Sequence, residues 1–194
     1  MAELPPPQPA ESLSRVQLLA AMGMTAVVLL IIARLWIWLD DVPLMATKLT
    51  TDVLLLGCVI GLGITLCSEG LYRIWKDYRE GADVYLSMIL RPLKMADLIW
   101  LGVLPGMSEE LLFRGVMLPA IGLNWFGILI SSLCFGVLHF FSPRHWCYVA
   151  WAAVVGGVLG ISALQTQNLL VPVVAHIVTN ILSSLLWKYK QAHH

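Results

Sequence analysis

The chain has 194 residues, of which 59% are hydrophobic and only 12% are charged, and its mean hydropathy is +0.81. A soluble domain carries about 25% charged residues, so much of this protein's surface must face lipid. The 12 basic residues are balanced by 12 acidic ones, which leaves no net positive charge of the kind that nucleic-acid-binding proteins use. The composition predicts an integral membrane protein without a nucleic-acid partner.

The chain begins with a polar, Pro-rich stretch, which we interpret as a tail over residues 1–15. This stretch lacks the basic n-region of a signal peptide, and the apolar run after it is longer than an h-region of about 7 to 15 residues. The run therefore predicts a retained membrane anchor.

Six apolar segments follow along the chain. A transmembrane helix needs about 20 mainly apolar residues to cross about 30 Å of hydrocarbon, and the second, fourth and fifth segments are short for this purpose. The segments are Val16–Leu39, Asp52–Ser68, Asp97–Leu118, Trp125–Phe141, Val149–Leu164 and Leu169–Trp187. The sequence predicts an all-α, polytopic bundle of about six transmembrane helices.

One sizeable polar stretch, Glu69–Lys94, separates the second and third predicted spans. Basic residues are interleaved there with apolar and aromatic ones, a mixture typical of an amphipathic helix on the membrane surface. Gly81 and Pro92 are expected to break this helix. We assign residues 69–96 to a cytoplasmic, interfacial segment.

Lysines and arginines indicate the orientation. If the six spans alternate in direction, only Lys48 lies on one side of the membrane. The basic residues on the other side are Arg15, Arg73, Lys76, Arg79, Arg91, Lys94, Arg144, Lys188 and Lys190. Because cytoplasmic loops carry an excess of basic residues, both termini are predicted to be cytoplasmic.

The third predicted span carries charges near its middle, where each charge costs about 2.5 kcal/mol or more. Glu110 and Arg114 are four residues apart, so they share a helix face and can pair. Glu109 points about 100° away from that face. Pro105-Gly106 is expected to break or kink the helix, with Ser108 capping the segment that follows.

Two later spans each contribute a pair of residues at the same four-residue spacing. These pairs are Phe135 with His139, and His176 with Asn180. Structural roles are open for each alone, since a buried Asn often joins helices and a Glu–Arg pair can be a packing clamp. Together they predict a functional site, in which Glu109, His139, His176 and Asn180 converge on one cavity.

Cysteines and glycines are interpreted as packing residues. The four cysteines lack a CxxC pair and are expected to be small, buried apolar side chains without a disulfide or metal role. Their positions are Cys58, Cys67, Cys134 and Cys147. Gly156-Gly157 and Gly160 are predicted to form a seam for close helix packing.

Glutamate and histidine around a cavity support two related hydrolytic mechanisms. In the first, Glu109 is a general base for water while His176 and Asn180 stabilise the oxyanion. In the second, Glu109, His139 and His176 bind a divalent metal such as zinc, which activates the water. The sequence has no HExxH signature, no GxSxG pattern and no aspartate pair of the kind that intramembrane aspartyl proteases use.

The polar residues form three motifs in chain order: Glu109-Glu110-x-x-x-Arg114, Phe135-x-x-x-His139 and His176-x-x-x-Asn180. These motifs resemble those of the CPBP family, which comprises type II CAAX prenyl endopeptidases and bacteriocin-processing or self-immunity (Abi) proteins. The Leu-Phe-Arg-Gly after the Glu pair and the Asn168–Pro172 stretch also fit. The resemblance covers about Leu98 to Leu186, nearly half of the chain.

The resemblance implies an intramembrane endopeptidase with its catalytic cavity open to the cytosol. In such a protein Glu109 would activate the water, His139 would assist the water or bind metal, and His176 with Asn180 would form the oxyanion hole.

Glu110 and Arg114 would support these residues, with Phe135 shaping the wall of the site. The resemblance implies that the substrate is a membrane-associated peptide or protein. A prenylated, CAAX-type substrate is one such possibility. The predicted organisation is two N-terminal spans over residues 16–68, the interfacial segment, a catalytic bundle over residues 97–188 and a tail over residues 189–194.

Two other classes of function stay open. A non-catalytic scaffold or regulator of the same family would bind a membrane-protein partner through the same cavity. A small transporter also uses buried glutamate and histidine, but the low number of spans and the absence of an inverted repeat argue against it.

Overall fold

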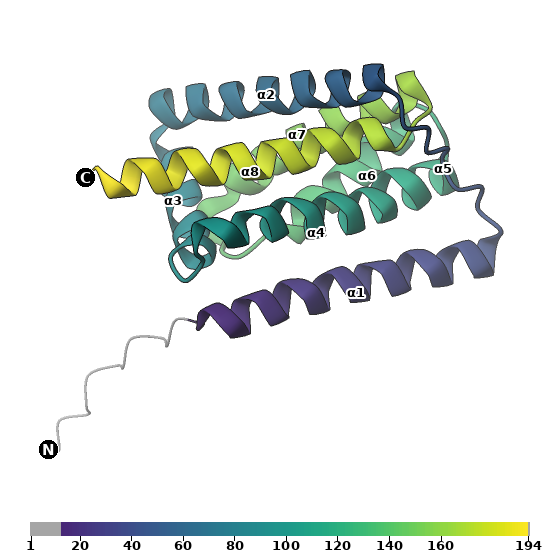
Figure 1. Ribbon diagram of the computed structural model, residues 1–194. Coiled ribbons are helices and arrows are strands. Elements are labelled where there is room, and N and C mark those ends of the chain that lie inside the picture. The colour runs from purple at the N-terminus through teal and green to yellow at the C-terminus, as the bar shows by residue number, and fades with distance from the viewer. Residues whose placement is uncertain (1–12, 194) are drawn as a thin grey trace, which may run out of the picture.

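The computed structural model describes residues 13–193, and in this part of the chain all regular structure is helical (Figure 1). The Pro-rich residues 1–12 and His194 lie outside the described residues. The helices are α1 (Arg15–Asp40), α2 (Thr51–Ile74), α3 (Lys76–Leu90), α4 (Leu98–Glu110), α5 (Leu118–Ile121), α6 (Trp125–Leu138), α7 (Trp146–Thr166) and α8 (Leu170–Ala192). A π-helical segment, η2 (Leu111–Met117), joins α4 to α5, and short 3₁₀ turns precede α4 and α7.

The predicted helical bundle is confirmed. Within residues 13–193, four helical stretches are long and apolar enough to cross a membrane, namely α1, α2, Pro143–Thr166 and α8. The third predicted span is the continuous stretch from α4 through η2 to α5. The long helices run nearly parallel or antiparallel to one another (Figure 1).

The fourth predicted span is shorter than expected. Helix α6 has 14 residues and is therefore about 21 Å long, which is less than the roughly 30 Å of a bilayer core. Its C-cap is His139, with φ −92° and ψ 8°, so the helix ends before the predicted boundary at Phe141.

The interfacial segment also differs from its prediction. Helix α2 continues to Ile74, beyond the expected end at Ser68, and α3 starts at Lys76. Gly81 lies inside α3 instead of breaking it. A Cβ at this position would lie 3.2 Å from the His145 side chain and 3.3 Å from that of Tyr148. The glycine lets α3 approach the start of α7 closely.

The basic residues of the charge-rich side gather at one end of the bundle. Arg15 Nη2 lies 2.6 Å from Asp97 Oδ1, and Lys188 Nζ donates to the Leu93 carbonyl at 2.6 Å. The beginning of α1 and the end of α8 both lie at this end (Figure 1). The backbone of Lys48 bonds to Asn168 near the beginning of α8, at the opposite end. The side of the membrane on which each end lies stays a prediction.

Helix α8 packs against glycine pairs on two neighbours. On α2, a Cβ at Gly57 would lie 2.6 Å from Val174 Cβ, and a Cβ at Gly61 would lie 2.6 Å from the Ala175 carbonyl oxygen. On α4, a Cβ at Gly102 would lie 2.6 Å from Ile181 Cγ1 of α8, and a Cβ at Gly106 would lie 2.5 Å from Ile177 Cγ1. Both pairs have GxxxG spacing, which allows helix backbones to approach closely in membranes.

The seam predicted in the fifth span is present in part. A Cβ at Gly156 would lie 3.1 Å from Arg114 Nη2, and one at Gly160 would lie 3.2 Å from Ile128 Cγ2. Gly157 has only Ser132 Oγ within 4 Å, at 3.9 Å. Gly156 therefore makes room for a charged side chain as well as for a helix.

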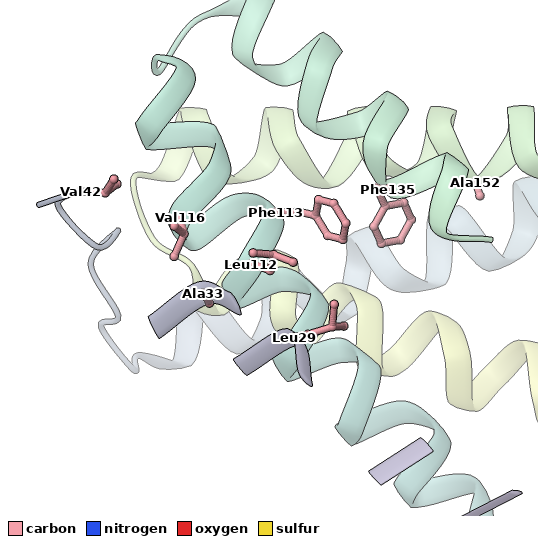
Figure 2. Packing of buried hydrophobic residues seen from close by; sticks show 8 residues of the cluster. All are labelled: Leu29, Ala33, Val42, Leu112, Phe113, Val116, Phe135 and Ala152. Atoms are coloured by element: carbon pink, nitrogen blue, oxygen red, sulfur yellow. The ribbon is translucent and has the colours of Figure 1, made fainter. Parts of the chain in front are cut away.

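A buried hydrophobic cluster joins α1, η2, α6 and α7 (Figure 2), and two of its members, Phe135 and Ala152, also line the cavity that holds the predicted site residues. Its members are Leu29, Ala33, Val42, Leu112, Phe113, Val116, Phe135 and Ala152. The rings of Phe113 and Phe135 meet edge to face at 5.5 Å, a favoured arrangement for aromatic pairs. Phe135 is consequently fixed in its orientation.

The prediction that all cysteines are buried is wrong. Cys58, Cys67 and Cys134 are exposed, and only Cys147 is buried, although all four are free thiols. The reason is that outward faces of a membrane bundle contact lipid, so apolar side chains are as well accommodated outside as inside.

The glycine contacts predict that Gly61→Ala destabilises the protein. The new methyl group would lie 2.6 Å from a backbone carbonyl of α8, and such overpacking costs about 1 to 3 kcal/mol. Thermal unfolding in detergent measures the loss. Gly63→Ala is the matched control, because it gives the same helix propensity but has nothing within 4 Å. Equal midpoints for the two variants would contradict the close contact.

The Arg15–Asp97 pair, at the turn before α4, predicts a pH dependence of stability. Bonds from Arg15 and from the Lys94 backbone N–H lower the pKa of the Asp97 carboxyl from 3.8 to about 2. A lowered folded-state pKa means that the stabilisation is present above about pH 4 and is lost as the pH falls toward 2. The difference in unfolding midpoint between wild type and Asp97→Asn should shrink over this range. A constant difference would contradict the role of the pair.

Candidate active site

The four predicted catalytic residues line one cavity of about 190 Å³. Glu109 comes from α4, His139 from the C-cap of α6, and His176 and Asn180 from α8. The cavity extends to Glu69 and Lys190, which pair at 2.6 Å. The structure therefore brings together on one cavity the residues that three separate motifs supply.

Glu110 and Arg114 lie behind the cavity and are completely buried. Arg114 Nη1 donates to Glu110 Oε1 at 2.7 Å, and Nη2 donates to the Gly156 carbonyl at 2.8 Å. The guanidinium carbon also lies 4.5 Å from the centroid of the Phe135 ring. Arg114, which η2 carries, thus bonds α4 to α7 and neutralises the buried carboxylate.

The same Glu110 oxygen orients His176. His176 Nδ1 lies 2.8 Å from Glu110 Oε1. Because a carboxylate paired with arginine only accepts hydrogen bonds, Nδ1 must carry the proton in this contact. The other ring nitrogen, Nε2, then faces the cavity and lies 4.0 Å from Glu109 Oε2.

Glu109, unlike Glu110, has no arginine or histidine hydrogen-bonded to its carboxylate within residues 13–193. It is 8% exposed, and its Oε2 atom forms no hydrogen bond within residues 13–193. A separation of 4.0 Å from His176 Nε2 is too long for a direct hydrogen bond, and it is a distance that one water molecule can bridge. Glu109 and His176 thus face each other across the cavity without a direct hydrogen bond.

His139 lines the cavity from the C-cap of α6. As the C-cap, His139 stands next to the Phe135 ring at 4.8 Å, and the same ring lies 5.7 Å from His176. The Nδ1 atom of His139 lies 3.0 Å from the Phe135 carbonyl, so its Nε2 is the nitrogen left for a substrate.

The expected break at Pro105-Gly106 does not occur, while the alternative of a kink stays a prediction. Helix α4 runs from Leu98 to Glu110 through Pro105, and the Ser108 hydroxyl donates to the Leu104 carbonyl at 2.7 Å instead of capping a new segment. Close packing on α8 keeps the helix continuous here. The irregularity comes one turn later, where η2 begins immediately after Glu110. Single-turn π segments are frequent at functional sites.

The three residues proposed to bind a metal are not arranged as a metal site. Within residues 13–193, no group of three His, Cys, Asp or Glu side chains is placed to hold one ion. His176 directs Nδ1 to Glu110 and His139 directs Nδ1 to a backbone carbonyl, which leaves each Nε2 free, as in metal-binding histidines, but these atoms do not converge on one ion with Glu109. The three side chains therefore do not form a preformed zinc site.

Sequence reasoning missed several aromatic residues of the cavity wall. Tyr85 of α3 lies 6.1 Å from the ring of His139 and packs on Tyr148 of α7 at 4.7 Å. Tyr78 also lines the cavity, and burial raises its pKa to about 12, so its hydroxyl stays protonated at neutral pH. The only signal was the aromatic content of the polar stretch before the third span.

Comparison with known proteins supports the resemblance drawn from the motifs. Residues 91–182 match the family model "Type II CAAX prenyl endopeptidase Rce1-like". A protein of Bacillus subtilis (strain 168), described as "Uncharacterized protein YpbD", is 37% identical over 81 residues. That match covers 42% of this chain and 40% of the relative. No solved structure matches the chain. The family match contains all the motif residues and excludes α1, α2 and α3.

The buried ion pair predicts that Arg114→Met is strongly destabilising. The change leaves the Glu110 carboxylate buried without its cation, and such a loss costs about 3 to 5 kcal/mol. Thermal unfolding in detergent gives the measurement. Lys76→Met is a suitable control, since the Lys76–Glu80 pair has 76% and 47% exposed side chains and should matter by less than about 1 kcal/mol. Similar midpoints for the two variants would contradict this account.

Proposed function

We propose that this protein is an intramembrane endopeptidase that hydrolyses a peptide bond in a membrane-associated substrate, with Glu109 as the base that activates water. The main support is the unpartnered Glu109 Oε2, which lies 4.0 Å from His176 Nε2 in the shared cavity. The match of residues 91–182 to a protease family supports the reaction class.

The first step is attack on the scissile carbonyl. Glu109 takes one proton from a water bound between its carboxylate and His176, and the water oxygen forms a bond to the carbonyl carbon. The carbonyl oxygen becomes an oxyanion. The Nδ1–H bond to Glu110 holds the His176 ring in place. The Asn180 amide can donate to that oxygen, and Nε2 can do so when the ring carries a second proton as imidazolium.

The second step is collapse of the tetrahedral intermediate. The bond between the carbonyl carbon and the amide nitrogen breaks, and Glu109 passes its proton to the leaving nitrogen. The products are a carboxylic acid and an amine, and the base is restored. His139 lines the same cavity, where its Nε2 can bond to the water or to the substrate backbone.

The substrate that we propose is a prenylated, CAAX-type C-terminal segment. The cavity has apolar and aromatic side chains along its wall, among them Leu86, Ile89, Leu101 and Trp187. Lys190 and Glu69 also line it, at the end of the bundle where the basic residues gather. A lipidated chain at the membrane surface can enter from that end, which we predict to be cytoplasmic.

The proposal predicts that Glu109→Gln abolishes cleavage without unfolding the protein. Purified full-length protein in detergent is given a pool of farnesylated and unmodified membrane peptides, and products are identified by mass spectrometry. Loss of the base should lower kcat by at least about 100-fold, and His176→Ala should do the same. Glu80→Gln is the control, because Glu80 is an exposed carboxylate on α3.

The same assay with a chelator added distinguishes activation of water by Glu109 from activation by a bound metal. Cleavage that survives chelation supports the glutamate mechanism, whereas loss restored by added zinc would replace it with the metal mechanism. Cleavage by Glu109→Gln at the wild-type rate would refute the assignment of the base. Absence of cleavage by the wild type for every peptide would favour a non-catalytic scaffold that binds a partner through the cavity.

A further inference from the structure

Pro105 has a position that the proposed reaction does not by itself explain. It lies in the middle of α4, where proline is normally excluded, and it lines the catalytic cavity. A proline inside a helix has no N–H to donate to the carbonyl four residues earlier, and its ring pushes against that carbonyl. Here the carbonyl is that of Leu101. Within a membrane protein, such a carbonyl needs another donor.

The donor that it receives comes from the site. Asn180 Nδ2 lies 3.4 Å from the Leu101 oxygen. Gly102, the next residue, has a backbone so close to α8 that a Cβ there would lie 2.6 Å from Ile181 Cγ1. The close approach brings the Asn180 side chain within reach of α4.

This contact determines which way the Asn180 amide faces. A carbonyl oxygen only accepts hydrogen bonds, so the NH₂ end of the amide must face Leu101 and the Oδ1 end must face away. One N–H hydrogen is used by Leu101, and the other is left for a group in the cavity. Without the free carbonyl, either end of the amide could face α4.

The same helical stretch supplies an internal comparison. Pro119 follows Gly115 by four residues, and the Gly115 carbonyl accepts from the backbone N–H of Met45 at 3.4 Å. In both cases another segment binds the carbonyl that lies four residues before a proline. The partner at Pro119 is a backbone group away from the cavity, whereas the partner at Pro105 is a predicted catalytic side chain.

We propose that Pro105 is a positioning residue: by freeing the Leu101 carbonyl, it orients the Asn180 amide as an oxyanion donor. This inference rests on the proposed endopeptidase function for its catalytic consequence. The structural part, a coupling between Pro105 and Asn180, does not depend on it.

A double-mutant cycle tests both parts on purified full-length protein. The variants are Pro105→Ala, Asn180→Ala, the combination, and Pro119→Ala as the matched control. In Pro105→Ala, the new alanine would donate its own backbone N–H to the Leu101 carbonyl within the helix. Asn180 then loses its acceptor while the helix becomes more regular. Thermal midpoints in detergent give a readout that needs no substrate.

If Pro105 and Asn180 are coupled, the effects of the two substitutions on the thermal unfolding midpoint are not additive. Asn180→Ala should lower the midpoint of the wild type but not that of Pro105→Ala, where the Leu101 carbonyl has a backbone partner. Pro105→Ala alone should not lower the midpoint. An equal drop on Asn180→Ala in both backgrounds would overturn the positioning role.

Cleavage of a farnesylated CAAX-type peptide gives the catalytic readout. Removal of one oxyanion donor costs about 100-fold or more in kcat, so Asn180→Ala should show about this loss and Pro105→Ala a smaller one of about tenfold, with KM unchanged. The double variant should equal Asn180→Ala, and Pro119→Ala should match the wild type. Losses that multiply would overturn the inference. If the wild type cleaves nothing, the proposed function fails while the midpoint cycle still decides the coupling.

Discussion

The buried contact between Glu110, Arg114 and His176 is the interaction on which the site depends. One carboxylate oxygen accepts from Arg114 at 2.7 Å and lies 2.8 Å from His176 Nδ1, and a further guanidinium nitrogen bonds α7. Charges in such surroundings are tolerated only when paired. The pairing therefore fixes three helices and one imidazole at once. Of the two adjacent glutamates, it commits Glu110 to structure and leaves Glu109 available for chemistry.

Close helix packing converts this pairing into a defined geometry. Glycines of α2 and α4 allow both helices to contact the backbone of α8, which carries His176 and Asn180. In lipid there is little hydrophobic gain from bringing helices together, so such close contacts supply much of the association energy. Phe135 adds a rigid wall, because its ring packs on Phe113 and lies beside both histidines. The proposed catalytic groups consequently stand on helices that have little freedom to shift.

Much of this arrangement could be predicted from the sequence. Apolar length located four helical stretches that can cross a membrane, where six spans were predicted, and the distribution of lysine and arginine separated the two ends of the bundle. Intramembrane charges identified the residues of the candidate site, since an isolated Glu or His in a span is too costly to be incidental. The four-residue spacing of Glu110 and Arg114 predicted their ion pair, and the structure shows it at 2.7 Å. Packing glycines were visible too, although the GxxxG pairs of α2 and α4 were overlooked.

Tertiary structure decided what local sequence does not specify. Pro105 was expected to break its helix, but packing on α8 and a bond from Asn180 to the Leu101 carbonyl satisfy the backbone there. His139, the C-cap of α6, lies beside Tyr85 of α3, a neighbour that no motif contains. Sequence by itself determined which residues must be buried together, because hydropathy and charge act residue by residue. Their distances and orientations were decided only when α8 packed between its neighbours, since those depend on side chains far apart in the chain.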